Sequence, residues 1–485
     1  MQELKPVSRA IPSLREVFDL NSVAIVGASG APSGAFTFPT VVIRSLIDAG
    51  FPHVYPVNPK YGMVLGLRCY PSVRDIPAAV DHVIIGVPAE NVLALLDDCA
   101  FKSVKSATFF TAGFSESNNL ERVKLEQEIL QKARQGGFRI IGPNCVGLFI
   151  PVVRLTNWVN LPLEPGRVAF ISQSGGHAMR LPLNAGLRGV RFSKVVSYGN
   201  ALDINESELL EYLADDPQTD LIACYIEGIK DGKRFIRSLH YAAGRKPVII
   251  YKGGQTEGGS KAALGHTAAL STCASTFQAI CRQVGALLVD NSDELEDVLV
   301  LMSHVDPLPS GNGVAVIGVG GGPSVMAGDE ASYAGLTLPQ LNPKQQEPLR
   351  QILPLDGSIF YNPIDAPNLL DPAVIEKTLL ELANLPQISA FVYHIGFHPS
   401  SMLGVGQLSQ NSFLNSFICA FNNVKVKTGK STLITLGPFL TPDGMRDFLI
   451  VRDALVAGGL PVFHSFQGMF RALGKILNTR LASVL

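Results

Sequence analysis

An apolar strand that ends in a small-residue turn and runs directly into a helix occurs three times in the chain. The three strands are expected at Ser22–Gly27, Arg167–Ser172 and Gly313–Gly318. Further strands, such as His53–Val57 and Leu221–Glu227, are expected between helical segments. Strands that alternate with helices form parallel sheets covered by helices. The pattern therefore predicts an α/β chain.

The spacing of these openings predicts three domains, as does the length of 485 residues at about 150 residues per domain. We expect the first domain at 1–150 and the second at 166–305, joined by an irregular connection with three prolines. The third is expected at 312–485, after the linker Asp306–Gly313, which is rich in proline and glycine.

Charge and cysteine content exclude several classes of protein. Lys+Arg is 40 and Asp+Glu is 41, so the chain lacks the basic excess that binding to nucleic acid requires. Seven scattered cysteines without a Cys-x-x-Cys pair favour free thiols in a reducing compartment, and no metal site is expected. No signal peptide and no apolar stretch of membrane-spanning length is found. We therefore expect a cytoplasmic protein without a membrane segment.

The first glycine turn suggests a phosphate-containing ligand. Gly27, Ser29 and Gly30 lie between a strand and a helix, where backbone amides and the helix dipole favour anions. The next strand ends at Asn58 and Lys60, whereas a site for NAD favours Asp or Glu there. This difference favours coenzyme A (CoA), although a turn that serves only packing remains the alternative.

Other candidate ligand contacts follow later strands of the same segment. Ligands of such sheets bind at the carboxyl ends of the strands. The candidate residues there are Val87, Pro88, Thr111 and Asn144, while Cys145 is expected to be packed. Taken singly, each could be an ordinary turn.

Two further helix starts resemble anion sites. In each, small residues follow a strand and precede a helix, so free amides and the helix dipole would meet a phosphate. The alternative is a capped turn without a ligand. Together they predict one charged group bound by both segments, through Ser172, Ser174, Gly175 and Gly176 in the second and Gly320, Gly321 and Gly322 in the third.

His266 is the candidate nucleophile. It is expected just before a helix, in a mobile glycine-rich loop that includes the segment 253–265, and an imidazole there can accept a phosphoryl group. Glu227, at the end of a strand, is the candidate acid that orients this imidazole. A solvated histidine and a surface acid are the alternatives. His177 is a less favoured second acceptor, a substrate contact or simply a histidine that packs on its helix.

Together these residues resemble the α subunit of NDP-forming acyl-CoA synthetases, relatives of succinyl-CoA synthetase. The resemblance runs from about Leu14 to the C-terminus. It rests on the order of several strings, which are Ser22–Gly30, Tyr55–Lys60, Thr111–Ser115, Gly142–Cys145, Ile171–Gly175, Val196–Asn200, Tyr225–Asp231, Gly265–Thr267, Gly320–Pro323 and Asn362–Asp365. The segment Gly27–Phe36 departs from the family because it lacks the usual Gly-Lys pair.

The resemblance implies a CoA-binding Rossmann domain followed by two flavodoxin-like domains. It implies an acid–thiol ligase that interconverts acyl-CoA, NDP and phosphate with acid, CoA and NTP, through an acyl phosphate and a phosphohistidine. By this likeness His266 is the phosphohistidine and Glu227 its supporting acid. The chain shows no ATP-grasp region, so ATP/ADP or GTP/GDP with Mg²⁺ is expected on an ATP-grasp β subunit of a hetero-oligomer.

Two other functions stay open at the level of sequence. One is a CoA- or acyl-CoA-binding regulator or carrier without the phosphoryl relay. The other is an NAD-dependent oxidoreductase, which Asn58 disfavours. The acid that is activated cannot be named from the sequence.

Overall fold

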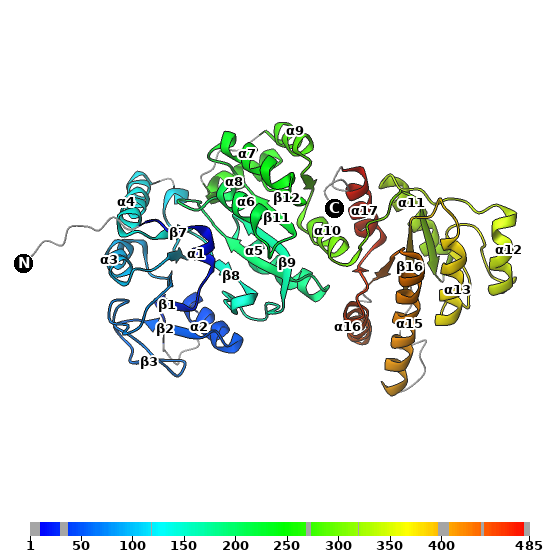
Figure 1. Cartoon of the computed structure of the whole chain (residues 1–485), viewed down its shortest axis with the longest axis horizontal. Coiled ribbons are helices and arrows are strands. Elements are labelled where there is room, and N and C mark those ends of the chain that lie inside the picture. Colours follow the sequence, from blue (N-terminus) through cyan, green and yellow to red (C-terminus); the bar gives the residue numbers. More distant parts are fainter. Residues whose placement is uncertain are drawn as a thin grey trace, which may run out of the picture. The chain divides into compact units, whose positions relative to one another are not determined.

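Three sheets form the framework of the protein in the computed structural model (Figure 1). The structure describes residues 10–29, 37–117, 119–267, 273–318, 320–395, 407–437 and 441–479. Their strand orders are β2-β1-β5-β6-β7, β13-β12-β11-β9-β10-β8 and β15-β14-β16-β17-β18. Apart from β8, all of these strands pair in parallel, which confirms the predicted α/β class.

The first sheet and its helices lie between residues 14 and 141. Its strands are β1 (Ser22–Val26), β2 (His53–Val57), β5 (His82–Ile85), β6 (Ser106–Phe109) and β7 (Arg139–Ile141). A hairpin of β3 (Met63–Val64) and β4 (Leu67–Arg68) follows β2. The helical elements are α1 (Leu14–Phe18), α2 (Phe38–Ala49), α3 (Val92–Lys102) and α4 (Leu120–Gly136), with the short 3₁₀ turns η1 (Ala89–Asn91) and η2 (Ser115–Ser117).

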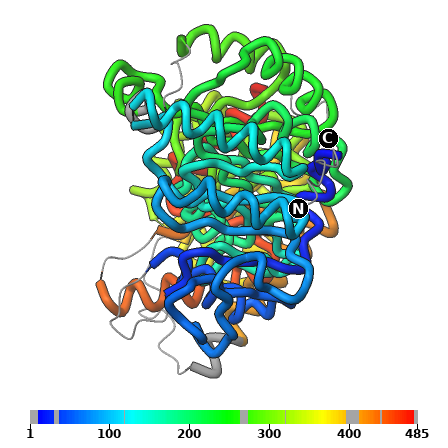
Figure 2. Tube along the Cα trace, turned by 90° about the vertical axis from the view of Figure 1, so that its left-hand side faces the viewer, coloured from blue at the N-terminus to red at the C-terminus, as the bar shows by residue number. Residues whose placement is uncertain are grey.

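Both faces of the first sheet are buried because alternate residues of its strands point to opposite sides. Val23 and Ile25 of β1 join a cluster that includes α2. Ala24 and Val26 join a second cluster with residues of α3 and α4. The helices α3 and α4 run side by side in both views (Figures 1 and 2). The run Ser22–Val26, which is apolar after its first residue, therefore fits a central strand with no exposed face.

The second sheet lies between residues 147 and 289. Its strands are β8 (Gly147–Phe149), β9 (Pro165–Ser172), β10 (Phe192–Ser197), β11 (Leu221–Ile226), β12 (Val248–Lys252) and β13 (Leu287–Val289). Its helices are α5 (Gly175–Leu187), α6 (Glu206–Asp215), α7 (Gly232–Ala243), α8 (Glu257–Thr267) and α9 (Ala274–Val284), with the 3₁₀ turn η3 (Pro151–Val153). The strand β8 pairs antiparallel with β10, so residues 147–149, expected in the first domain, are part of the second sheet.

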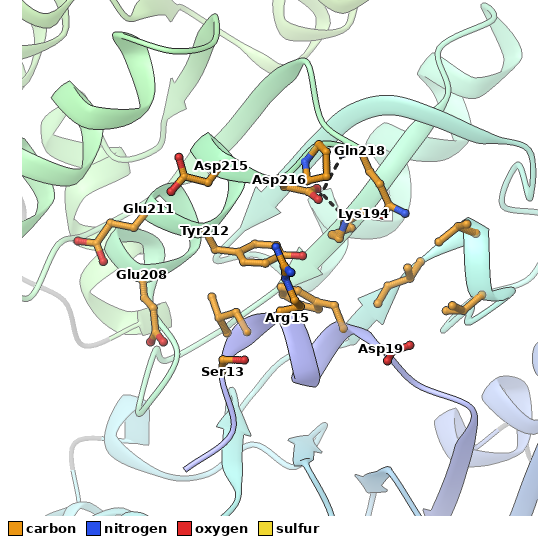
Figure 3. Close-up of a pocket in the computed structure, with 16 residues that line it drawn as sticks. Ser13, Arg15, Asp19, Lys194, Glu208, Glu211, Tyr212, Asp215, Asp216 and Gln218 are labelled. Atoms are coloured by element: carbon orange, nitrogen blue, oxygen red, sulfur yellow. Dashed lines mark hydrogen bonds and ion pairs between the residues drawn. The ribbon is translucent and has the colours of Figure 1, made fainter. Parts of the chain in front are cut away.

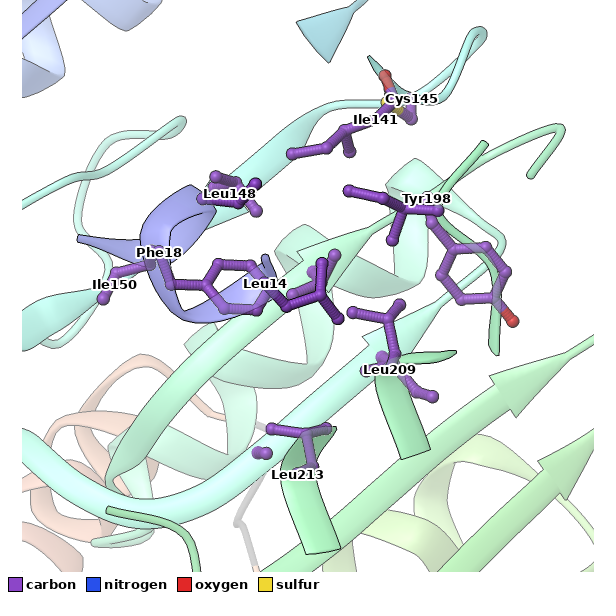
Figure 4. Packing of buried hydrophobic residues seen from close by; sticks show 14 of the residues in the cluster. Leu14, Phe18, Ile141, Cys145, Leu148, Ile150, Tyr198, Leu209 and Leu213 are labelled. Carbon is purple, nitrogen blue, oxygen red and sulfur yellow. Dashed lines mark hydrogen bonds between the residues drawn. The ribbon is translucent and has the colours of Figure 1, made fainter. Parts of the chain in front are cut away.

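The first two sheets share one apolar core. The cluster on the α2 side continues through α1 to residues of β8, β9 and α6. Figure 4 shows Leu14 and Phe18 of α1 beside Leu148 and Leu209. The buried Arg139 of β7 adds an ionic link to the second domain, because its guanidinium lies 2.7 Å from the carboxylates of both Asp203 and Glu208. Residues 10–186 and 191–290 accordingly form one compact unit.

The third sheet belongs to a second compact unit, residues 187–190 and 291–479. Its strands are β14 (Val314–Gly318), β15 (Ile364–Asp365), β16 (Ala390–Ile395), β17 (Thr432–Leu436) and β18 (Val462–Phe463). Its helices are α10 (Ser292–His304), α11 (Gly321–Tyr333), α12 (Pro343–Ile352), α13 (Pro372–Ala383), α15 (Gln407–Thr428), α16 (Pro442–Ala457) and α17 (Phe466–Asn478). Helix α10, which we expected at the end of the second domain, packs against α17, where Lys475 and Glu294 lie 2.9 Å apart.

The glycine-rich segment before His266 is a helix over much of its length, not the loop that we expected. Helix α8 begins at Glu257 and includes His266 in its last turn. Lys261 and Glu257 form an i,i+4 ion pair at 2.8 Å, and the run Lys261–Leu264 consists of good helix formers. These local preferences outweigh the cost of the glycines at 258, 259 and 265. None of the helices in the described ranges has the length and apolarity needed to cross a membrane.

Candidate functional site

The carboxyl end of β1 is a turn that requires glycine. Gly27 has φ +95°, and a Cβ atom there would lie 2.5 Å from the carbonyl oxygen of Gly86, after β5. The next turn is fixed by Ser29, whose backbone amide donates to Thr40 Oγ1 at 3.4 Å. Gly30 lies outside the described residues. The ends of β1 and β5 thus meet closely at the sheet edge where ligands of parallel sheets bind.

Asn58 holds this turn in place. Its Nδ2 donates to the carbonyl oxygen of Ala28 at 2.6 Å, and its Oδ1 accepts from the backbone amide of Lys60 at 3.0 Å. Both ends of the Asn58 amide are therefore bonded to backbone. The Lys60 side chain is exposed at the same end of β2. Asn58 shapes the edge, and the binding of an anionic ligand by Lys60 stays a prediction.

Hydrogen bonds join the ends of β5 and β6 to the turn after β7. Thr111 Oγ1 donates to the carbonyl oxygen of Val87 at 2.6 Å, and the backbone amide of Asn144 donates to the carbonyl oxygen of Thr111 at 3.0 Å. Asn144 has φ +57°, a conformation that asparagine tolerates better than most residues. Pro88 is exposed at this edge, while Cys145 is buried and burial raises the pKa of its thiol to about 12. Cys145 is therefore a packed thiol.

The loop after β9 presents backbone amides at the start of α5. Ser172 Oγ donates to the carbonyl oxygen of Ser174 at 2.7 Å, which holds the turn. Ser174 Oγ accepts from the amide of His177 at 3.4 Å. Within the described part of the chain, the amides of Gly175 and Gly176 have no acceptor, as is usual in the first turn of a helix. Two donors at the positive end of the helix dipole are thus available to an anion.

One cavity brings these two groups of residues together. It measures about 430 Å³ and lies in the first unit. The edge of the first sheet and the loop before α5 line it, with Gly86, Val87, Phe110, Thr111, Ala112, Asn144, Cys145, Val146, Ser174, Gly175, Gly176 and Met179. Six residues predicted from the sequence to bind CoA or phosphate therefore share one space.

Glycine at position 175 allows the start of α5 to pack closely against the turn after β7 of the first domain. A Cβ atom on Gly175 would lie 3.1 Å from Cγ1 of Val146, which belongs to the turn after β7. A larger residue would therefore push the start of α5 away from that turn. The small residue serves close packing as well as the exposure of its amide.

Glu227 is buried at the end of β11, and Gln173 fixes its backbone. The Gln173 Oε1 atom accepts from the amides of Glu227 and Gly228, the latter at 2.9 Å, and its Nε2 donates to the carbonyl oxygen of Gly228 at 2.9 Å. Both side chains are buried, with exposed fractions of 4% for Gln173 and 6% for Glu227. The loop before α5 and the acid are thus one rigid assembly.

A buried lysine and a tyrosine surround Glu227. The Lys252 ammonium donates to the carbonyl oxygens of Glu227 at 2.6 Å and of Gly253. Burial lowers the pKa of Lys252, and the charge of Glu227 opposes this effect. Burial, and next the Glu227 carboxylate, raise the pKa of Tyr225 well above its ordinary value. A Cβ on Gly253 would lie 2.6 Å from the Tyr225 hydroxyl, so glycine is required beside the acid.

His177 packs against tyrosines near Glu227. Its ring centroid is 4.2 Å from that of Tyr225 and 5.8 Å from that of Tyr251. Burial lowers the pKa of His177, Arg180 lowers it further, and Glu227 opposes both. His177 is half-buried and does not line the cavity of 430 Å³. The described contacts of His177 are thus those of a packed ring, and its role as a substrate contact or second acceptor stays untested.

The backbone of His266 is described, in the last turn of α8, whereas its side chain is not. Helix α8 packs against η2, which follows Thr111 at the edge of the first sheet. The helix that carries the candidate nucleophile therefore lies beside the turn that follows Thr111 at the edge of the first sheet. The contact between the His266 imidazole and Glu227, expected from the sequence, stays a prediction.

The third helix start, in the second unit, has a similar design. Gly320 has φ +121°, and its amide donates to Asp365 Oδ1, at the end of β15, at 2.9 Å. Helix α11 begins at Gly321, with Pro323 in its first turn as expected. Gly321 and Gly322 are exposed at this helix start.

Sequence reasoning missed Gln173, Tyr225 and Lys252 as residues of the site. Gln173 lies inside a string that we singled out for its serines and glycines. Lys252 is a charged residue at the end of an apolar strand directly before two glycines, a signal that could have found it. Their roles depend on contacts between β9, β11 and β12, which neighbours in the sequence do not reveal.

A larger cavity of about 700 Å³ in the first unit contains none of the predicted residues (Figure 3). Most of its charged side chains already have protein partners. Lys194 lies 2.7 Å from Asp216, Glu208 binds Arg139, and Glu211 lies 3.0 Å from Arg234. We therefore take the smaller cavity as the candidate site, because it is lined by Gly175 and Gly176, whose backbone amides have no acceptor in the described part of the chain.

Comparisons with known proteins identify two domains along the chain. Residues 21–151 match the family described as a CoA binding domain, and residues 165–302 match the succinyl-CoA ligase like flavodoxin domain. The α subunit of the ADP-forming acetate–CoA ligase II of Pyrococcus furiosus is 38% identical over 348 residues, 72% of this chain and 75% of that protein.

Two other proteins extend the comparison. The ADP-forming acetate–CoA ligase I of Archaeoglobus fulgidus is 38% identical over 353 residues, 73% of this chain, but the match spans only 50% of that protein. Among solved structures, a dinucleotide-forming acetyl-coenzyme A synthetase of Ca. Korarchaeum cryptofilum, in complex with phosphate and ADP, has 28% identity and a TM-score of 0.77. That alignment covers 97% of this chain and 98% of the other.

Proposed function

Because the chain belongs to the family of ADP-forming acetate–CoA ligases, we propose that it is the α subunit of an NDP-forming acyl-CoA synthetase. The membership confirms the resemblance inferred from the sequence and does not favour a carrier without the relay. In the proposed reaction, acyl-CoA, NDP and phosphate are interconverted with free acid, CoA and NTP.

The cavity of 430 Å³ is the observation that carries this proposal. CoA would bind along the edge of the first sheet, near Lys60, with its thiol end in the cavity beside Asn144. Phosphate would bind to the amides of Gly175 and Gly176, in the same cavity. A thioester and a phosphate held in one cavity are the reactants of the first chemical step.

In that step a phosphate oxygen attacks the carbonyl carbon of the thioester. A C–O bond forms, the C–S bond breaks, and CoA leaves as a thiolate that takes up a proton. The products are acyl phosphate and CoA. The helix start at Gly175 and Gly176 contributes by orienting the phosphate and offsetting its negative charge.

In the second step an imidazole nitrogen of His266 attacks the phosphorus atom of acyl phosphate. An N–P bond forms, the P–O bond breaks, and the acid leaves as a carboxylate. Glu227 would hold the imidazole in its reactive tautomer and offset the positive charge that develops. The packing of α8 against η2 supports the role of His266, because it places the helix that carries His266 beside the first sheet.

The final transfer, from phosphohistidine to NDP, would take place with a partner. The Pyrococcus furiosus relative is named as an α subunit, and a separate ATP-grasp β subunit that binds nucleotide and Mg²⁺ fits that name. Gly320, Gly321 and Gly322 are proposed as a second phosphate contact in the relay, on the strength of their helix start. We expect the reaction in the cytoplasm, where the reduced thiol of CoA is maintained.

The first two steps need only this chain, and this permits a direct test. The purified full chain is incubated with ³²P-phosphate and a panel of thioesters from acetyl-CoA to phenylacetyl-CoA, without nucleotide. We expect a label on the chain that is labile in acid and stable in base. The label should be lost in His266→Asn and reduced in Glu227→Gln, while CoA binding measured by calorimetry is retained.

The matched control is His240→Asn, which removes an exposed histidine on α7 and should label like the parent chain. If His266→Asn carries as much ³²P label as the parent chain, His266 is not the phosphoryl acceptor. Loss of the label in His177→Asn would then identify His177 as the acceptor. Acid-dependent ATP turnover by the rigorously purified chain alone would contradict the need for a partner.

A further inference from the structure

A buried asparagine joins the second domain to the turn that follows Thr111. Asn200 lies in the loop after β10 and has an exposed fraction of 2%. Its Nδ2 atom donates to Glu116 Oε2 at 2.6 Å, and it also lies 3.3 Å from Glu126 Oε1 and 3.4 Å from Ser115 Oγ. Asn200 is therefore a donor from the second domain that ties down both η2 and α4 of the first.

The carboxylate of Glu116 shapes the same turn from within. Its Oε1 accepts from the amide of Gly113 at 2.6 Å, and its Oε2 accepts from the amide of Phe114 at 3.2 Å. The Oε2 atom thus serves both the turn and Asn200. Hydrogen bonds to a charged group are stronger than those between neutral groups. One carboxylate with partners in both domains therefore fixes the place of η2.

Asn200 is itself held through its backbone. Its amide donates to the carbonyl oxygen of Pro143 at 3.0 Å, in the turn after β7. Its carbonyl oxygen accepts from the Lys230 ammonium at 2.6 Å, and the same ammonium donates to the carbonyl oxygen of Ala201 at 3.2 Å. Lys230 follows Glu227 by three residues. The loop of Asn200 is therefore anchored to the edge of the first sheet and to the segment after the acid.

A second acid depends on the same amide. Glu126 of α4 is 3% exposed, and it accepts from Ser115 Oγ at 3.2 Å as well as from Asn200. Burial raises the pKa of Glu126, hydrogen bonds from Ser115 and Asn200 lower it, and the charge of Glu116 raises it. Removal of the Asn200 amide would leave two neighbouring acids without the donor that they share. The network is thus sensitive to this one side chain.

The turn η2 also supports the helix of the candidate nucleophile. Helix α8 packs against η2 and includes His266 in its last turn. Attack on phosphorus requires an aligned imidazole nitrogen, and a misplacement of about 1 Å can lower a rate about 10²-fold. A shift of η2 would move the surface against which α8 packs, and with it the position of His266.

We infer that Asn200 and Glu116 are positioning residues for the phosphoryl transfer, because their hydrogen bond fixes η2 and η2 sets the position of the helix that carries His266. The inference rests on the proposed function, since it takes His266 as the acceptor. Neither Asn200 nor Glu116 lines the cavity of 430 Å³. We therefore expect them to govern the rate of transfer and not the binding of CoA.

The rate of ³²P labelling of the full chain tests this inference, with the thioester of the panel that labels the parent chain best. Initial rates measured against thioester concentration give a maximal rate and a half-saturating concentration. Asn200→Ala and Glu116→Gln should each lower the maximal rate at least about tenfold. The half-saturating concentration, and the affinity for CoA in calorimetry, should stay within about threefold of the parent. An unchanged maximal rate, or a parallel loss of CoA binding, would overturn the positioning role.

A double variant shows whether the two residues act through one bond. If they do, Asn200→Ala combined with Glu116→Gln should label within about threefold of the slower single variant, whereas multiplied losses would refute the shared bond. The matched control is Glu128→Gln, which removes an exposed carboxylate of α4 and should label like the parent. Absence of label from the parent chain with every thioester would instead refute the proposed function, and the inference with it.

Discussion

Replacing Gln173 by leucine should both destabilise the first unit and slow the phosphorylation of the chain. The Gln173 amide is buried and makes three hydrogen bonds to the backbone at Glu227 and Gly228. Leucine has a similar volume and makes none of them. The two backbone amides would be left without acceptors in a place that water does not reach.

An unsatisfied buried donor costs about 1–3 kcal/mol, so the loss of two acceptors should reduce stability by about 2–6 kcal/mol. The matched control is Gln340→Leu in the second unit. The Gln340 amide also bonds backbone oxygens, those of Asn362 at 2.7 Å and Leu338 at 3.2 Å, but the residue is exposed. Water can replace its bonds, and we expect a change within about 0.5 kcal/mol.

The measurement should resolve the two units, because a chain with two compact units need not unfold in one transition. Urea unfolding combined with hydrogen exchange followed by mass spectrometry satisfies this need. We expect faster exchange in peptides that cover β11 and the Gly228 turn, and slower ³²P labelling. Native exchange rates there, with an unchanged urea midpoint, would show that the bonds of Gln173 do not hold the acid in place.

Two further predictions concern a glycine and a buried acid. Gly27→Ala should lower CoA affinity at least about tenfold in calorimetry, because its Cβ would lie 2.5 Å from a backbone oxygen at φ +95°; native affinity would remove this turn from the site. Burial raises the pKa of Glu206 from 4.5 to about 6. Between these two pH values the folded chain retains a proton that the unfolded chain releases, so the stability of the fold falls as the pH rises from 4.5 to about 6. Glu206→Gln should therefore stabilise the chain by about 2 kcal/mol at pH 7 and hardly at pH 4, and an equal gain at both pH values in urea unfolding would contradict this cause.

The strands and the location of the site follow from local patterns. Runs such as Ser22–Gly27 and Leu221–Glu227 consist of apolar residues that end in a glycine or an acid, and the structure has strands at Ser22–Val26 and Leu221–Ile226. Because parallel strands place their carboxyl ends at one edge, residues such as Thr111 could be assigned to that edge without knowledge of side-chain contacts.

Other features depend on contacts between distant residues and could not be predicted. The short strand β8 has no periodicity of its own, and only its pairing with β10 reveals which sheet it joins. The packing of α10 on α17, nearly two hundred residues later, has no signal in the local sequence. In α8, glycines suggested a loop, while the alanines and the ion pair of Lys261 stabilise a helix.

The common core of the first two sheets has a consequence for the entropy of the reaction. Both walls of the cavity are anchored to the same packed residues and to the ion pairs of Arg139, so their separation is set when the chain folds. A thioester and a phosphate bound there would meet without the closure of one domain on another. Well-oriented reactants reach effective concentrations of about 10⁵–10⁸ M. The two reactants lose their freedom of motion when they bind, and because folding has already fixed the walls, no further entropy is lost in bringing two domains together.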